Sequence, residues 1–133
     1  MKRLFRSTRA ATAVEFALLA PLFFLMLFGI IEMSRVLWAQ ETIEEVAFAT
    51  ARCMSVSDQC ASEAQQRQFA LARASHSGIG LTGADVVLLP NADCNGVPAN
   101  AVRLTTSFAS PVRGLVPGIP QKLQAEACFP VLS

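Results

Sequence analysis

A long apolar run near the N-terminus limits what this chain can fold into. Residues 10–31, AATAVEFALLAPLFFLMLFGII, contain one charged residue, Glu15. As an α-helix with a rise of about 1.5 Å per residue, the run is long enough to cross a hydrocarbon core of about 30 Å. The sequence therefore predicts a helix that spans a membrane once.

The charges on either side of the run predict its orientation. Four cations and no acid precede it, namely Lys2, Arg3, Arg6 and Arg9. Because Lys and Arg favour the cytoplasmic side, we expect a cytoplasmic N-terminus, with residues from about 33 onward outside. All four cysteines follow the run, in agreement with an oxidising compartment. A cleaved signal peptide is the alternative, but the run is longer than the usual apolar region and no small-x-small site follows closely.

The helical pattern continues beyond the apolar run. A stripe of mostly apolar residues recurs at steps of three and four, and consists of Val36, Ala39, Ile43, Val46 and Thr50. The acids Glu41, Glu44 and Glu45 lie outside this stripe. The pattern predicts one helix from about residue 8 to about residue 54. Pro21 either bends this helix or is tolerated, as prolines are in other membrane helices.

The remaining sequence predicts a small α+β domain. Ser62 and Gln65 form a possible capping box for a second helix, which ends at Gly78. The apolar side of this helix is thin and consists mainly of Ala64, Leu71 and Ala72, with Phe69 nearby. Residues 85–89 and 102–108 are typical of a β-hairpin with Asn95-Gly96 in its turn region, and 122–129 of a third strand. The expected fold class is α+β, with a long transmembrane helix extending into an outer domain that has a second helix and a three-stranded antiparallel sheet. Residues 111–120, PVRGLVPGIP, are expected to form a rigid loop.

Glu15 is the residue that structure alone explains least well. A carboxylate at membrane depth costs at least a few kcal/mol unless it is neutralised or paired. It could extend toward water at the cytoplasmic interface and pair with Arg9. It could instead meet a cation of another molecule, such as the α-amine that Ala11 gains if the chain is cut after Ala10.

The stretch RSTRAATAVEFALLAPLFFLMLFGIIEMSRVLW resembles the N-terminus of class IVb prepilins, most closely the TadE-like minor pilins of tight-adherence (Tad, Flp) pilus systems. The shared features are a short basic leader, a small residue before the cut, Glu at the fifth mature position followed by Phe, and an apolar helix. The segment ARC at 51–53 with Cys60, the proline-rich PVRGLVPGIP and the closing LQAEACFP also resemble the outer domain of that family. The resemblance therefore covers most of the chain.

The resemblance implies processing by a prepilin peptidase between Ala10 and Ala11, with Glu15 guiding cleavage or assembly and Phe16 beside it. Leaders in this family usually end in Gly, whereas this one ends in Ala10, so the peptidase must accept an additional methyl group. The implied partners are the peptidase, other pilin subunits and minor pilins, an inner-membrane assembly platform and membrane lipid.

The four cysteines could bind zinc or form two disulfides. No CxxC pair is present, which disfavours zinc. Of the three possible pairings we favour Cys53–Cys60, which closes the loop between the helices, and Cys94–Cys128, which ties the first strand to the last. The second bond closes the longer loop, and in the chain-entropy model it stabilises the fold by roughly 3–4 kcal/mol.

The sequence thus predicts a basic leader over residues 1–10, a transmembrane and amphipathic helix over 11–54 and an extracytoplasmic α+β head over 55–133. We expect a minor pilin or pseudopilin in the bacterial inner membrane that enters or initiates an extracellular pilus for adhesion or secretion. The alternative is an unprocessed, membrane-anchored periplasmic binding or scaffold protein. The net charge of +1 disfavours nucleic acid as a partner, and the single histidine, His76, is expected to be inert, so neither an enzyme nor a cofactor is predicted.

Overall fold

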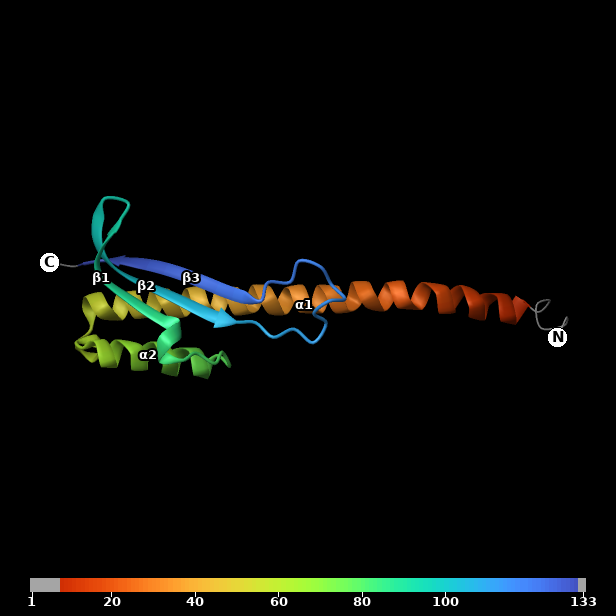
Figure 1. Cartoon of the computed structure of the whole chain (residues 1–133), viewed down its shortest axis with the longest axis horizontal. Coiled ribbons are helices and arrows are strands. Elements are labelled where there is room, and N and C mark those ends of the chain that lie inside the picture. Colours follow the sequence, from red (N-terminus) through yellow and green to blue (C-terminus); the bar gives the residue numbers. More distant parts are fainter. Residues whose placement is uncertain (1–7, 132–133) are drawn as a thin grey trace. The chain divides into compact units, whose positions relative to one another are not determined.

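The computed structural model describes residues 8–131, with side chains from residue 11 onward. The longest element is α1 (Thr8–Val56), which continues through Pro21 (Figure 1). It confirms the prediction of one helix from about residue 8 to about residue 54. The predicted leader cations at positions 2, 3 and 6 and the side chain of residue 9 lie outside the described residues.

The described chain forms two compact units, and α1 contributes to both. One unit contains α1 up to Arg35 together with Ser110–Ile119, and the other contains Val36–Ala109 and the chain from Pro120 onward. The second unit holds the α+β domain, in which the later turns of α1, the helix α2 and three strands pack together (Figure 1). The fold class expected from the sequence is confirmed.

The core of the α+β unit is built on the predicted stripe of α1. Val36, Ala39, Ile43, Val46 and Thr50 are all buried, whereas Glu41, Glu44 and Glu45 are exposed. Contacts from this part of α1 reach the sheet. The amide of Gln40 donates to the carbonyl oxygen of Gln124 at 2.9 Å, and the ring of Phe48 meets that of Phe129 edge-on, with centroids 5.8 Å apart.

The second helix begins as the sequence predicts. A short 3₁₀ turn, η2 (Asp58–Cys60), follows α1, and α2 (Glu63–His76) starts at the N-cap Ser62. The backbone N–H of Gln65 donates to the Ser62 hydroxyl, and the Gln65 side chain accepts from the Ser62 N–H at 3.0 Å, which completes the capping box.

The prediction of which residues α2 buries is wrong. Ala70 and Ala74 are the buried residues, whereas Ala64 and Ala72 are exposed and Leu71 is only half-buried. Two alanines four residues apart let the helix backbone approach its neighbours closely. Polar contacts fix the rotation of the helix, since Arg67 donates to the carbonyl oxygens of Gly83 and Val86, and Arg73 pairs with Glu45 of α1 at 2.9 Å.

The sheet is antiparallel, in the order β1-β2-β3, with β1 (Val86–Cys94), β2 (Val97–Ser107) and β3 (Lys122–Pro130). Another 3₁₀ turn, η3 (Gly83–Asp85), leads into β1, and the hydroxyl and N–H of Thr82 hold the pKa of Asp85 below its usual value. The side chains of Leu104, Leu123 and Ala125 are buried, and Arg103 pairs with Glu126 at 2.8 Å between exposed positions.

The hairpin is longer than the sequence predicts. Cys94 pairs directly with Val97, so Asn95-Gly96 is a two-residue turn, and both turn residues have positive φ, at 57° and 82°. Positive φ at both central residues is what a two-residue type I′ turn requires, and the backbone of this turn matches the twist of the flanking strands. The prediction ended the first strand at Leu89, whereas β1 continues through Pro90 to Cys94, since β1 is an edge strand, where proline is tolerated.

The central strand provides a test of this core. Leu104 has no exposed surface, whereas Val97 on the same strand is 51% exposed. We expect Leu104→Ala to lower the free energy of unfolding by about 2–5 kcal/mol because it leaves a cavity. Val97→Ala should change it by less than about 0.5 kcal/mol. Chemical denaturation of the full chain in detergent micelles measures both, and equal effects would contradict the assigned core.

Candidate functional site

The residues predicted to direct processing and assembly lie on the first turns of α1. The backbone of Ala10 is helical, so the predicted scissile bond to Ala11 lies just inside the helix, which begins at Thr8. Ala11, Glu15 and Phe16 are all exposed. Ala11 and Glu15 are four residues apart, and this spacing places them on the same face of the helix.

The apolar run that surrounds Glu15 is largely exposed among the residues that the structure describes. Most of its large side chains are at least half exposed, among them Leu18, Leu19, Leu22, Phe23, Met26 and Ile30. Among the residues that the structure describes, α1 is the one helix long and apolar enough to cross a membrane, as judged by length and composition. It fits a single-pass membrane anchor, and Glu15 is the charge within the exposed apolar segment.

An ion pair with a buried carboxylate lies where the apolar run ends. Glu32 is only 4% exposed, and its Oε1 accepts a hydrogen bond from Arg35 at 2.6 Å. Ser110, at the start of the segment Ser110–Ile119, lies beside this carboxylate. Nothing in the local sequence pattern predicted the burial of Glu32, because Ser110, which lies beside it, is distant in sequence.

The segment Ser110–Ile119 packs along the apolar run itself. A pocket of about 220 Å³ separates one face of α1, made by Pro21, Phe24, Leu25 and Phe28, from Val112, Leu115 and Val116. The sequence predicted a rigid proline-rich loop here but not its contact with the helix. The apolar residues between the prolines were the signal that could have indicated it.

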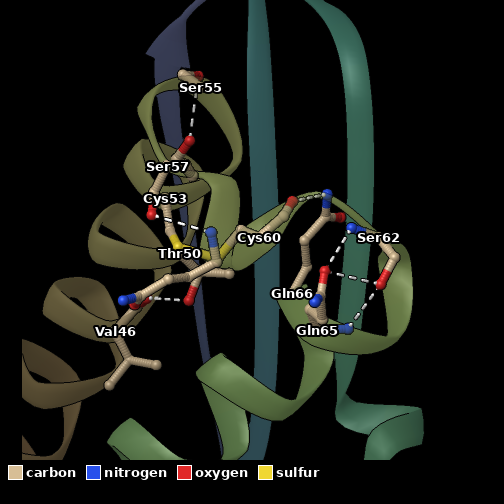
Figure 2. The surroundings of a disulfide bond; sticks show 11 residues. Val46, Thr50, Cys53, Ser55, Ser57, Cys60, Ser62, Gln65 and Gln66 are labelled. Atoms are coloured by element: carbon tan, nitrogen blue, oxygen red, sulfur yellow. Dashed lines mark hydrogen bonds between the residues drawn. A yellow bond between two sulfur atoms is a disulfide. The ribbon is translucent and has the colours of Figure 1, made fainter.

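Both favoured disulfides are present. Cys53–Cys60 joins the last turns of α1 to η2, with Cα atoms 5.7 Å apart (Figure 2). Hydrogen bonds brace this junction, from the Ser57 N–H to the Cys53 carbonyl at 3.1 Å and from the Gln66 amide to the Cys60 carbonyl at 2.9 Å. The loop between the helices is thereby fixed at both ends.

The second disulfide, Cys94–Cys128, has Cα atoms 6.5 Å apart and links the end of β1 to β3. Since β2 lies between these strands, the bond joins the two outer strands of the sheet. The described residues contain no group of three or more His, Cys, Asp or Glu that could hold a metal ion. His76 is exposed at the end of α2.

The comparisons with known proteins point to one family. Residues 10–52 match the family model of TadE-like proteins. No curated protein and no solved structure matches the chain. The family is structural and not enzymatic, and its members are associated with other components of Tad pili.

The two disulfides are expected to stabilise the head unequally. The half-cystines are 7 residues apart in Cys53–Cys60 and 34 apart in Cys94–Cys128. In the chain-entropy model, replacing the first pair by alanines should cost roughly 2.5 kcal/mol and replacing the second roughly 4 kcal/mol. Free energies of unfolding of the two double variants, each compared with the oxidised native chain, measure this, and a larger loss for the shorter loop would contradict it.

The match covers the membrane-spanning run and the following turns of α1, so the resemblance seen in the N-terminal sequence is confirmed over residues 10–52, and it suggests a Tad pilus-associated protein.

Proposed function

We propose that this chain is a minor pilin, or pseudopilin, of a Tad (Flp) pilus, which a prepilin peptidase cleaves between Ala10 and Ala11. The mature chain then enters or initiates a pilus that serves adhesion or secretion. The observation that carries the proposal is Glu15, a carboxylate on the exposed apolar part of α1, within the segment that matches the TadE-like family.

The physical argument rests on charge in an apolar medium. Cleavage after Ala10 would create a positive α-amine at Ala11, at the start of the mature helix. A helix N-terminus favours a nearby carboxylate, and the exposed Glu15 side chain can also reach the amine of a neighbouring subunit. In lipid each charge alone is unfavourable, so pairing them favours the addition of one subunit to another.

The proposed topology follows from the same segment. Residues 1–10 form a cytoplasmic leader, 11–54 the anchor and its amphipathic continuation, and 55–133 a periplasmic head attached to the bacterial inner membrane. Two disulfides in the head support an oxidising compartment. The basic residues before the run support a cytoplasmic N-terminus.

The proposed partners are the prepilin peptidase, other pilin subunits and minor pilins, and an inner-membrane assembly platform. Lipid would cover the exposed side chains of α1, such as Phe16 and Leu18, before assembly. Helices of neighbouring subunits would cover them in the pilus. An unprocessed membrane-anchored scaffold is the second candidate, and it is favoured by Ala10 standing where leaders of the family usually have Gly.

Substitution of Glu15 tests the proposal. We expect Glu15→Gln to reduce incorporation into pili at least about tenfold, since the loss of only ~1.4 kcal/mol between subunits has that effect. Glu41→Gln is the matched control, because Glu41 is an exposed carboxylate of the same helix outside the apolar run. Quantitative immunoblotting of sheared pili and of membranes in the native host measures both. Wild-type incorporation of Glu15→Gln would contradict the proposed role of the carboxylate, and absence of the wild-type chain itself from pili would leave the unprocessed scaffold as the better account.

A further inference from the structure

The connection between β2 and β3 contains a segment, Ser110–Ile119, that packs on the apolar run of α1. Val112, Leu115 and Val116 of this segment line a pocket of about 220 Å³ together with Pro21, Phe24, Leu25 and Phe28 of α1, which lie at helical steps of three and four and so form one face. By the rise of a helix, Phe24 lies about 12 Å from Glu32 toward the N-terminus. The segment therefore reaches well into the part of α1 that is expected to span the membrane.

The opposite face of the same helical turns is exposed among the described residues. Phe23 is 62% exposed, and Leu22 and Met26 are similarly exposed. A row of such side chains needs an apolar medium around it, and a single-pass anchor finds that medium in the acyl chains of the membrane. Lipid that covers Phe23 and Met26 also surrounds whatever packs on the other side of these turns.

The outward side of the segment suits that medium. Leu115 is 70% exposed although it borders the contact with α1. Irregular backbone is costly in lipid when its N–H groups lack acceptors. Pro111 and Pro117 have no N–H, and four of the other eight residues of the segment, Val112, Arg113, Leu115 and Val116, donate theirs to Ser110 or Val112. Arg113 has an exposed side chain, long enough to extend its charge toward lipid headgroups.

From these observations we propose that Ser110–Ile119 is a lipid-inserting segment, which enters the outer leaflet beside α1 and presents Leu115 to the acyl chains. The occupant of this apolar surface is membrane lipid. The inference rests on the membrane anchoring of α1 proposed above. It gives the protein a second membrane contact, at residues that lie far beyond the spanning helix in sequence.

Tryptophan depth measurements test the proposal on the full-length chain. Trp38→Phe removes the single native tryptophan, and one new tryptophan is then introduced by Leu115→Trp, Leu18→Trp or Val97→Trp. Each variant is reconstituted at one chain per nanodisc, in phosphatidylethanolamine and phosphatidylglycerol with or without acyl-brominated lipid. All three positions are exposed, so the larger side chain is tolerated. Disulfide formation on non-reducing gels checks the fold.

We expect brominated lipid to quench Leu18→Trp and Leu115→Trp at least twofold, and to leave Val97→Trp, at the hairpin end of β2, unchanged. If Leu18→Trp is quenched and Leu115→Trp is not, membrane anchoring by α1 is supported but insertion of Ser110–Ile119 into lipid is overturned. Blue-shifted emission of Leu115→Trp without quenching also overturns insertion, because protein and not lipid would then cover residue 115. If Leu18→Trp is unquenched, the anchoring is wrong and the proposal falls with it. Equal quenching of Val97→Trp and Leu115→Trp also overturns the proposal.

Discussion

Most of the apolar first half of α1 is exposed in the part of the chain that the structure describes, and the other features of the molecule depend on this constraint. Side chains such as Leu18 and Phe23 are more than half exposed, although they belong to the most hydrophobic stretch of the sequence. Such a surface needs an apolar medium around it. A single-pass membrane anchor satisfies this requirement, and the proposed entry into a pilus would satisfy it through the helices of other subunits.

One face of the later turns of α1 is buried in the α+β unit. There the helix forms one side of a small core, in which Ile43 and Val46 are buried. Small domains have little apolar area to bury, so covalent links matter more. Cys53–Cys60 fixes the exit of α1, and Cys94–Cys128 joins the outer strands. One helix thus provides both the exposed apolar run and part of the core of the α+β unit, and the two disulfides stabilise the α+β unit, whose apolar core is small.

Local signals in the sequence predicted the features that depend on local chemistry. The stripe of residues at steps of three and four indicated the buried face of α1. The pair Ser62 and Gln65 indicated the start of α2, and Asn95-Gly96 indicated the hairpin turn. Features set by distant packing were not predicted. The burial of Ala70 and Ala74 depends on how α2 packs, with Arg67 and Arg73 in contact with residues outside α2, and the buried Glu32 lies beside Ser110. The roles of Ala10, Ala11, Glu15 and Phe16 depend on a peptidase and on other subunits, and they remain proposals.

Identification of the N-terminal residue of the protein in its native host is the most direct test of the proposed pairing between Glu15 and an α-amine. Intact mass spectrometry of the chain recovered from sheared pili and from inner membranes would locate it. The account predicts that the pilus-associated chain begins at Ala11, with a free α-amine and without the basic leader. A pilus-associated chain that retains residues 1–10 would contradict it, because no α-amine would then be present at membrane depth to pair with Glu15.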